Sequence, residues 1–468
     1  MRVPLDRQAV VIVVLLATLA CGLRFHRLGA WSFAHDELAT LEEDAAFFHG
    51  ASTAAASQTV RLSRLLPVSY SLLHLGYEAF GRDEFGSRVV PALFGTAGVL
   101  LVFLLLDGLL GRTVALAAGG LVALWPEHLF RSQENRFYVI AMFFAGACLL
   151  FGARALERRS TKDAIASSLA GILALLSHTV SVSALFIAMA GLTVAAIVRR
   201  ERVPTRVLAP FGLGLAAVFL VGGLVVAPLV RGWNAGENWG YSVGHAVLAS
   251  VNMLGWSVAL LSAIGILCMA WRRTAQDLYW ITAFFGWGVA SLVLPKLVAY
   301  HPGYVFPLAL SALVPAAIAI DRFSEALRPL GRTPAIGCLA LCCLLNLPSV
   351  ASYYLDGSRP EWRAAAQFVR RRWRPTDRVT SFAQAFIRYY APECTPAIPL
   401  SMDHPVASLE RLISEPGRLW VVVASSRAGL EPGLKGWLRH RCAYESEFVK
   451  TRYDYSENRV EVYQCAGL

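Results

Sequence analysis

The sequence predicts an α-helical polytopic membrane protein with a small α/β domain at its C-terminal end. Of the 468 residues, 56% are hydrophobic and only 16% are charged, whereas soluble globular chains are about one-quarter charged. The apolar residues form long blocks, and a block of about 18 or more is typical of a transmembrane helix. Beyond about residue 351 the blocks end, and shorter helix-like and strand-like segments alternate. We therefore expect a membrane domain over residues 1–351 and a second domain over residues 352–468.

About eleven apolar blocks are long enough to span a bilayer. The first block, from Gln8 to Leu23, is not followed by a small-residue cleavage site, so we interpret it as a retained anchor rather than a signal peptide. The stretch 163–198 fits either two spans or one re-entrant unit. The expected spans lie at approximately 8–27, 89–109, 113–130, 137–156, 163–177, 180–198, 207–230, 246–270, 278–297, 303–320 and 334–351.

Arginines in the short connections predict the orientation of these spans. With a cytoplasmic N-terminus, the inside connections carry residues such as Arg112, Arg199 and Arg272, while the opposite connections near 177–181 and 231–245 have almost no Lys or Arg. This distribution follows the positive-inside rule. It also explains the net charge of +11 without nucleic acid as a partner. Two hydrophilic regions, the first loop and the C-terminal tail, are then expected to face outward.

The two outward regions contain recognisable elements. Within the loop 28–88, the segment Leu65–Leu75 is apolar but too short to span, which suits an interfacial helix. In the tail, Glu361–Trp373 has a helical period and is rich in arginine. Arg418–Ala424 is typical of a buried strand, and Arg459–Tyr463 of a final strand. The tail is therefore expected to form a small α/β domain.

Three of the nine cysteines lie in the tail, at Cys394, Cys442 and Cys465. An oxidising compartment permits one disulfide among them. Cys442–Cys465 is the preferred pair, because these residues flank a plausible closing hairpin. No cysteine or histidine spacing resembles a zinc site, so we predict no metal site and no cofactor, while a dependence on a divalent ion stays open.

The adjacent carboxylates Asp36 and Glu37 follow the first span directly. Charged groups near a bilayer concentrate at functional positions, because a charge at its centre costs about 2.5–3.5 kcal/mol. One interpretation is a general base that accepts the proton of an attacking hydroxyl group. The alternative is a solvated loop or the acidic start of a helix.

A second polar cluster, Arg131–Tyr138, lies at the outer end of the third span and opens directly into the next. Arg136 is a candidate to bind phosphate through two parallel hydrogen bonds, with Glu134 and Tyr138 beside it. The alternative is an interfacial loop with an arginine whose charged end reaches the headgroups and a tyrosine anchor.

A third cluster, residues 295–304, also maps to the outer face. Lys296, His301 and Tyr304 lie there, and Pro302-Gly303 breaks the helix. Helix ends at such breaks can bind anions, although a kinked loop with an anchoring lysine explains the pattern equally well. His178 maps outward too and fits either a substrate-binding residue or a structural histidine at a helix end.

The chain resembles the GT-C superfamily of integral-membrane glycosyltransferases over roughly residues 20–320. The resemblance is to the bacterial protein-mannosyltransferase-like and aminoarabinose-transferase-like group. Arg24–Gly29 followed by His35-Asp36-Glu37 is similar to the acidic motif of the family's first loop. Leu65–Gly95 resembles the segment that leads into its second span, and Ser132–Tyr138 resembles its outward loop. The chain departs from the family pattern at Leu66-Pro67 and Gly303-Tyr304.

The resemblance implies an enzyme that transfers a sugar from a polyprenyl-phosphate donor to an acceptor hydroxyl, with inversion, at the periplasmic face of the bacterial inner membrane. Asp36 matches the family's catalytic acid, and Glu37 is expected to orient it or the acceptor. Arg136, Lys296 and His301 are the candidates to hold the donor phosphate. The lipid bilayer and a lipid-linked sugar are the implied partners, and the acceptor, whether lipid, glycan or protein, is open.

Two other functions remain alternatives at this stage. A transporter or flippase of polyprenyl-linked sugars requires polar residues near the middle of several spans, whereas the polar residues of this chain gather at the outer ends of its spans. A non-catalytic relative that serves as a scaffold has the same sequence pattern as an active enzyme.

Overall fold

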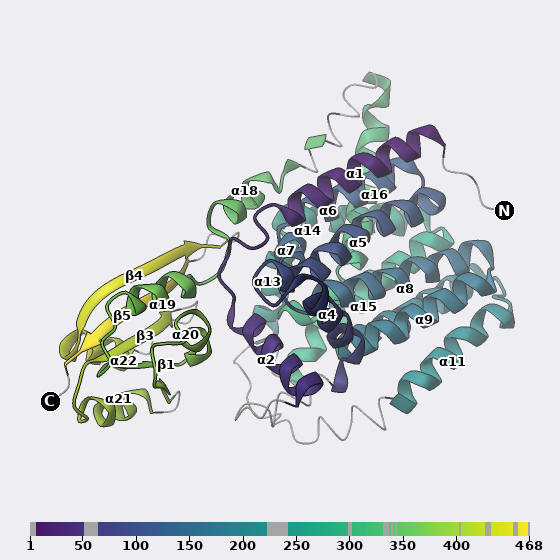
Figure 1. The fold of residues 1–468 in the computed structure, drawn as a ribbon. Helices are drawn as coiled ribbons and strands as arrows, with labels where there is room; N and C mark the ends of the chain where they lie inside the picture. Colours follow the sequence, from purple (N-terminus) through teal and green to yellow (C-terminus); the bar gives the residue numbers. More distant parts are fainter. Residues whose placement is uncertain are drawn as a thin grey trace. The chain divides into compact units, whose positions relative to one another are not determined.

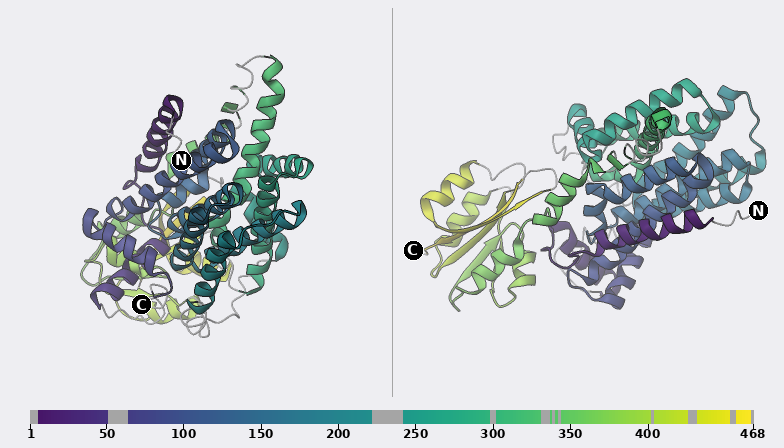
Figure 2. Two further views of the ribbon diagram at one scale, coloured as in Figure 1. Left: turned by 90° about the vertical axis from the view of Figure 1, so that its right-hand side faces the viewer. Right: turned by 90° about the horizontal axis from the view of Figure 1, so that it is seen from above.

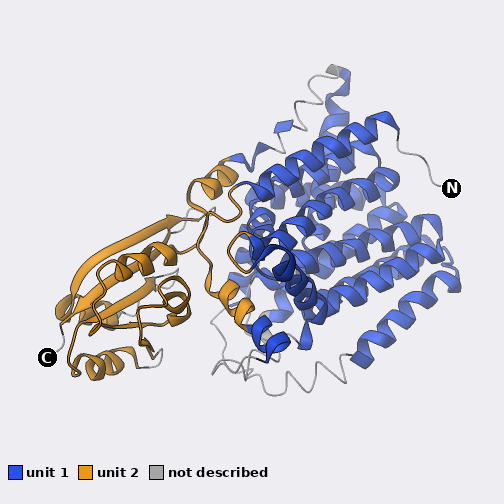
Figure 3. Cartoon of the chain, in the orientation of Figure 1, with its two compact units in different colours: residues 1–26, 43–81, 86–347 blue, residues 27–42, 82–85, 348–468 orange. Residues whose placement is uncertain are grey.

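The computed structural model describes residues 6–50, 64–221, 242–297, 302–330, 344–401, 404–425, 432–452 and 457–466, together with residues 337, 340 and 341. The chain forms two compact units, which Figure 3 colours separately. Unit 1 contains residues 1–26, 43–81 and 86–347, and unit 2 contains residues 27–42, 82–85 and 348–468. The second unit is therefore assembled from three separate stretches of the chain, two of them from the loop that was expected to belong to the membrane domain.

All regular elements among the described residues of unit 1 are helices (Figure 1). Helix α2 (His35–His49) begins in unit 2 and ends in unit 1. The other helices of unit 1 are α1 (Arg7–Phe25), α4 (Pro67–Phe80), α5 (Gly86–Leu110), α6 (Arg112–Leu124), α7 (Pro126–Ser132), α8 (Tyr138–Arg158), α9 (Thr161–Ser177), α10 (Ser183–Arg199), α11 (Thr205–Val221), α13 (Val243–Leu254), α14 (Trp256–Arg272), α15 (Ala275–Leu297) and α16 (Leu310–Leu327). Short 3₁₀ turns are η1 (Thr179–Val182), η3 (Pro302–Tyr304), η4 (Phe306–Leu308) and η5 (Arg328–Leu330).

The helices of unit 1 make the chain a polytopic membrane protein. Among the described residues, six helical segments are long and apolar enough to cross a bilayer, and the number rises to eight if each of two bent pairs is one span. In Figure 1, α5, α8 and α9 run side by side, and 72% of the apolar window of α8 is buried inside the unit. The expected spans 207–230 and 334–351 lie partly outside the described residues. The count of about eleven therefore stays a prediction.

Two of the expected continuous spans are interrupted. Over 113–130, helices α6 and α7 meet at an angle of 61°, because Trp125 is extended and Pro126, which lacks an N–H group, opens the next helix. Over 246–270, helices α13 and α14 meet at 99°. The residue between them, Gly255, has φ +85°, in the left-handed region that favours glycine. The structure corrects the expectation of one uninterrupted helix at each place.

Small residues allow the helices of unit 1 to pack closely. A Cβ atom at Gly265 of α14 would lie only 1.9 Å from the carbonyl oxygen of Pro315 in α16. Beside this contact, the Ser262 hydroxyl donates a hydrogen bond to the carbonyl oxygen of Ala312 at 2.8 Å. Close backbone approach at small residues, with hydroxyl groups that bond across the interface, is the usual way helices associate in lipid.

Helix α4 forms in the segment predicted to be an interfacial helix, with different bounds. The expected segment ended at residue 75, whereas α4 continues to Phe80, with Pro67 in its first turn. Tyr70, Leu73 and Tyr77 are buried within unit 1. One face of the helix therefore packs against its own unit. Leu75 lies on another face and is exposed.

Unit 2 contains a five-stranded sheet with the order β2-β1-β3-β5-β4, which Figure 2 shows from two further directions. The strands are β1 (Arg378–Ser381), β2 (Ala397–Pro399), β3 (Leu419–Ser425), β4 (Ala443–Thr451) and β5 (Glu457–Cys465). Strand β1 pairs in parallel with β2 and β3, and β5 pairs antiparallel with β3 and β4. The helices are α18 (Leu347–Asp356), α19 (Trp362–Arg370), α20 (Gln384–Tyr390), α21 (Pro405–Ile413) and α22 (Pro432–Arg441).

Strand β3 is buried on both faces, as its apolar sequence predicts. Leu419 and Val421 pack with Leu409 of α21 and Leu438 of α22 in one core cluster. Trp420 points to the other face, where its ring centroid lies 6.4 Å from that of Phe368 near the C-terminal end of α19. The strands predicted at 418–424 and 459–463 correspond to β3 and β5.

A disulfide closes the β4–β5 hairpin. Cys442 directly precedes β4, Cys465 ends β5, and the two sulfur atoms are bonded. This is the pair that the sequence favoured. Cys394 has a free thiol and is buried.

Candidate functional site

The adjacent carboxylates Asp36 and Glu37 have different environments, although both lie in the first turn of α2. Glu37 is fully buried, and its Oε2 accepts a hydrogen bond from the backbone N–H of Ala34 at 2.8 Å. The same oxygen accepts a hydrogen bond from Nε of Arg359 at 3.2 Å. Asp36 is exposed. Of the two, Glu37 therefore stabilises the start of the helix, and Asp36 presents its side chain at the surface of unit 2.

Arg359 is held in place by further hydrogen bonds within unit 2. Its Nη1 donates to the carbonyl oxygen of Gly357 at 3.1 Å and to the hydroxyl of Tyr353 at 3.3 Å. Gly357 has φ +77°, and a Cβ atom there would lie 2.3 Å from the ring of Trp31. The buried guanidinium thus has its carboxylate and its neutral acceptors in place, which is the condition for a tolerated buried ion pair.

A second ion pair in unit 2 is formed by Glu84 and Arg363. Tyr390 connects this pair to the backbone at Phe33. The Glu84 carboxylate accepts hydrogen bonds from Arg363 Nη2 at 2.5 Å and from the Tyr390 hydroxyl at 2.7 Å. The Tyr390 hydroxyl in turn accepts a hydrogen bond from the backbone N–H of Phe33 at 2.8 Å. Burial, together with the charge of Glu84, raises the pKa of Tyr390 above its usual range. The phenol therefore stays protonated and fixes the backbone just before Asp36.

In unit 1, the predicted polar cluster 131–138 is buried. Arg131 forms ion pairs with Glu127 at 2.8 Å and with Glu134 at 2.7 Å. Its guanidinium also lies 4.5 Å from the ring centroid of Tyr138. Side-chain exposure is below 10% for Arg131 and for both glutamates. Such pairing is required where charges are removed from water.

Aromatic and cationic side chains converge beside this ion-pair network. The His178 ring centroid lies 5.3 Å from that of Phe137, 5.5 Å from Tyr138 and 5.6 Å from Tyr304. The Arg136 guanidinium lies 4.5 Å from the ring centroid of Phe137. We call these five residues the His178 cluster. They come from the start of α8, the α9–α10 connection and η3.

His178 has an unsatisfied polar atom. Its Nδ1 is buried and has no hydrogen-bond partner among the described residues, and the same holds for the hydroxyl groups of Ser177 and Ser181 on either side. A buried polar group without a partner costs about 1–3 kcal/mol. A guanidinium, an imidazole and two phenol groups, of which only that of Tyr304 is half-buried rather than buried, form a suitable environment for an anionic group.

The backbone of the 132–136 segment is fixed by contacts to two other helices. Gln133 Nε2 donates to the carbonyl oxygens of Arg24 at 2.8 Å and of His26 at 2.9 Å. Asn135 Oδ1 accepts a hydrogen bond from the hydroxyl of Tyr77 at 2.7 Å. These contacts hold the residues that precede Arg136 in one conformation.

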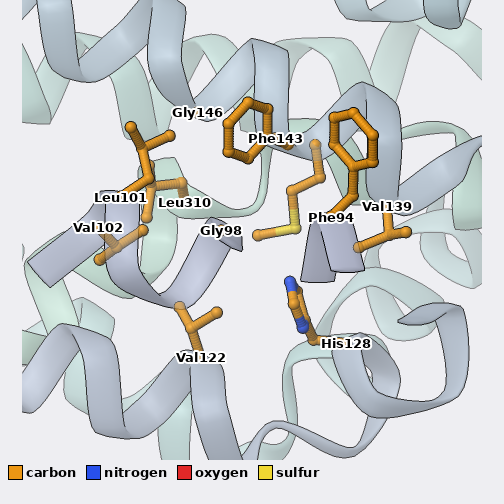
Figure 4. A pocket seen from close by; sticks show the side chains of 11 residues that line it. Phe94, Gly98, Leu101, Val102, Val122, His128, Val139, Phe143, Gly146 and Leu310 are labelled. Carbon is orange, nitrogen blue, oxygen red and sulfur yellow. The ribbon is translucent and has the colours of Figure 1, made fainter. Parts of the chain in front are cut away.

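Figure 4 shows a pocket lined mainly by apolar side chains, together with His128 of α7. Its empty volume, including space open to the surroundings, is about 300 Å³. His128 is the polar side chain in its wall, and Arg24 Nη2 lies 2.7 Å from Nδ1 of that histidine. The other lining residues are Phe94, Gly98, Leu101, Val102, Val122, Val139, Met142, Phe143, Gly146 and Leu310. The lining residues come from α5, α6, α7, α8 and α16, so this space is a narrow gap where five helices pack.

The structure brings together five of the residues predicted to bind the donor. Arg136, Tyr138, His178 and Tyr304 lie in the His178 cluster, and Glu134 is joined to it through Arg131. The side chain of Lys296, at the end of α15, and the whole of His301 lie outside the described residues. The predicted catalytic pair Asp36 and Glu37 belongs to unit 2.

Sequence reasoning did not select Glu127, Arg131 or Arg359 for a role. The spacing of four residues between Glu127 and Arg131 is a known helical ion-pair signal, but Glu127 lay inside the expected span 113–130 and Arg131 in the polar cluster after it. Arg359 could not be paired with Glu37 from sequence, because 322 residues separate them.

Comparisons with known proteins agree with this architecture. Residues 66–226 match the family model for dolichyl-phosphate-mannose-protein mannosyltransferase. No protein with a curated description matches the chain significantly. Among solved structures, ArnT from Cupriavidus metallidurans in the apo state aligns with a TM-score of 0.59 and 14% identity, over 97% of this chain and 98% of ArnT.

Two further solved structures contain lipid phosphates. The same ArnT bound to undecaprenyl phosphate aligns with a TM-score of 0.56 and 14% identity, over 96% of this chain and 97% of ArnT. The oligosaccharyltransferase AglB from Archaeoglobus fulgidus, in complex with an inhibitory peptide and a dolichol-phosphate, aligns with a TM-score of 0.54 and 13% identity, over 93% of this chain and 72% of AglB. The chain therefore has the GT-C fold of integral-membrane glycosyltransferases.

Proposed function

We propose that this protein is a membrane glycosyltransferase that takes its sugar from a polyprenyl-phosphate donor. The observation that carries the proposal is the fold shared along nearly the whole chain with ArnT, which has been solved with undecaprenyl phosphate bound. The match of residues 66–226 to a family that uses a dolichyl-phosphate sugar supports the same donor class.

The His178 cluster is the proposed site for the donor phosphate. Arg136 supplies a guanidinium, and the phosphate provides a partner for the buried Nδ1 of His178. Charge-assisted hydrogen bonds of this kind are shorter and about twice as strong as neutral ones. Lys296 and His301 remain candidates for additional phosphate contacts.

Asp36 is the proposed general base, and its exposed carboxylate supports this role. The oxygen of an acceptor hydroxyl attacks the anomeric carbon, and the bond from that carbon to the phosphate oxygen breaks. Polyprenyl phosphate leaves with the bonding electrons, Asp36 takes the hydroxyl proton, and the configuration is inverted. Glu37, bonded to Arg359, holds the first turn of α2 that carries Asp36.

The location we propose is the extracytoplasmic face of the bacterial inner membrane, with a cytoplasmic N-terminus. The arginine-rich connections on the opposite face support this orientation. The Cys442–Cys465 disulfide supports an oxidising compartment for unit 2.

Binding of undecaprenyl phosphate to the purified full chain tests the donor site. Arg136→Ala removes a charged donor, and a hydrogen bond to a charged group is worth about 1.5–3 kcal/mol, so affinity should fall about 10–100-fold. Arg206→Ala is the matched control, because Arg206 is an exposed arginine of α11 outside the cluster. Equal affinity in wild type and Arg136→Ala would remove this arginine from the phosphate site.

Sugar transfer in cells tests the base. A deletion strain is complemented with wild type or Asp36→Asn, and its glycans and lipids are compared by mass spectrometry. A product that wild type restores and Asp36→Asn does not, at equal protein level in the membrane, is the expected result. General-base catalysis typically contributes 10²–10⁴-fold, so wild-type product from Asp36→Asn would refute the assignment.

The transporter alternative predicts a different result in vesicles. Purified protein reconstituted with a polyprenyl-phosphate sugar would move the lipid between leaflets without consuming it. A transferase consumes the donor and releases polyprenyl phosphate only when an acceptor is present.

A further inference from the structure

Asp44, His49 and His74 form a side-chain cluster in unit 1 that is separate from the His178 cluster. Asp44 and His49 lie in the second half of α2, and His74 lies in the middle of α4. Each residue offers one potential ligand atom, and the three atoms lie within 4.8 Å of one another. None of these residues has a role in the proposed transfer reaction.

We propose that these three residues bind one divalent transition-metal ion, with Zn²⁺ as the best fit. Two imidazoles and one carboxylate are ligands that Zn²⁺ accepts, at about 2.0–2.2 Å each. Mg²⁺ and Ca²⁺ prefer all-oxygen ligand sets. A tetrahedral ion would need its ligand atoms about 3.3 Å apart at these bond lengths, so the cluster is already close to a binding geometry.

The carboxylate and one imidazole are already adjacent. His74 Nδ1 lies 3.0 Å from Oδ1 and 3.3 Å from Oδ2 of Asp44. The Asp44 side chain is fully buried, and that of His74 is 18% exposed. A buried carboxylate that faces an imidazole is suited to a cation, because a positive ion offsets the cost of removing the negative charge from water.

The orientation of His74 is fixed by an aromatic neighbour. The Phe48 ring stacks on the imidazole with a centroid distance of 3.8 Å and an interplanar angle of 12°. His49 reaches the cluster from the last position of α2, with its ring centroid 5.6 Å from that of His74. Because His49 is exposed, its ring can move toward an ion, and a water molecule can complete the coordination as in open zinc sites.

An ion at this site would connect the end of α2 to the middle of α4. This site could not be predicted from sequence, because Asp44 and His49 are five residues apart and His74 comes 25 residues later. These intervals match none of the usual zinc spacings. The helices, rather than a local motif, bring the ligands together.

Zinc binding by the purified full chain tests the site. The protein is prepared with a tag that contains no histidine, treated with a chelator, and dialysed against Zn²⁺ with excess Mg²⁺. We expect about one Zn²⁺ per chain. His49→Ala carries little risk to folding because His49 is exposed, and His74→Gln removes the central ligand. Loss of a partner that only orients a metal ligand typically costs 10–100-fold in affinity, so each variant should lose at least tenfold.

A spectroscopic measurement and a control complete the experiment. Co²⁺ in place of Zn²⁺ should give the visible absorption of a four-coordinate site in wild type, and this signal should be lost in His74→Gln. His245→Ala, which removes an exposed histidine of α13, should bind as wild type does. Failure of wild type to bind Zn²⁺ would overturn the proposal, and so would wild-type affinity for Zn²⁺ in both His49→Ala and His74→Gln. The proposed transferase activity would be unaffected by that result, because none of the three residues contributes to it.

Discussion

Replacement of Glu37 by alanine should destabilise unit 2 strongly, while replacement of its neighbour Asp36 should not. The Glu37 and Arg359 side chains are 0% and 1% exposed. Glu37→Ala leaves the guanidinium buried without its carboxylate and removes the acceptor of the Ala34 N–H group. Breaking a buried ion pair by removing one partner costs about 3–5 kcal/mol. Asp36→Asn changes an exposed group, for which changes within about 0.5 kcal/mol are usual.

Urea titration of the full chain in detergent, followed by tryptophan fluorescence, measures this difference. The double variant Glu37→Leu with Arg359→Met removes both charges, and such replacements are often close to neutral. It should therefore recover most of the stability that Glu37→Ala loses. Wild-type stability in Glu37→Ala, or a double variant no more stable than Glu37→Ala, would show that the pair does not hold unit 2 in this way.

Three further predictions concern unit 2. Serine in place of Cys442 and Cys465, which are 23 residues apart, should cost about 3 kcal/mol by the loop-entropy relation, read as a lower urea midpoint. For Asp377, burial opposes ionisation, but hydrogen bonds from Arg418 prevail and hold the pKa of the carboxyl below its usual 3.8. The stability that this carboxylate contributes is complete above about pH 4 and is lost as pH falls through the lowered pKa. Asp377→Asn should therefore weaken the fall in the free energy of unfolding at acid pH. An unchanged acid dependence would contradict this. Gly357→Ala should cost at least about 1–2 kcal/mol, because its positive φ disfavours a side chain and a Cβ atom would contact a neighbouring indole ring; a wild-type urea midpoint would argue against that strain.

The fold class could be predicted because it depends on local composition. Apolar blocks define helices wherever they occur, and the apolar run of β3 identified a buried strand without knowledge of its neighbours. The preferred disulfide depended on a hairpin whose two strands are adjacent in sequence. The breaks at Trp125 and Gly255 were missed, because a short interruption does not lower the hydropathy of an apolar block.

The candidate site could be predicted only in part. The residues around Arg136 were found because polar residues that open an apolar span are conspicuous. The different environments of Asp36 and Glu37 were not visible in residue type, since both are carboxylates in one helical turn. What distinguishes them is a long-range partner, Arg359, and sequence patterns do not report such pairs.

The pairing of Glu37 with Arg359 also sets an order of events during synthesis. Glu37 emerges from the ribosome 322 residues before its partner, which at about 5–20 residues per second is a delay of about 16–64 s. Through that interval the Glu37 carboxylate has no Arg359 with which to form the ion pair. The turn that carries Asp36 therefore reaches its final structure only after the membrane helices between the two residues have been synthesised. A truncated or stalled chain carries Asp36 and Glu37 without Arg359.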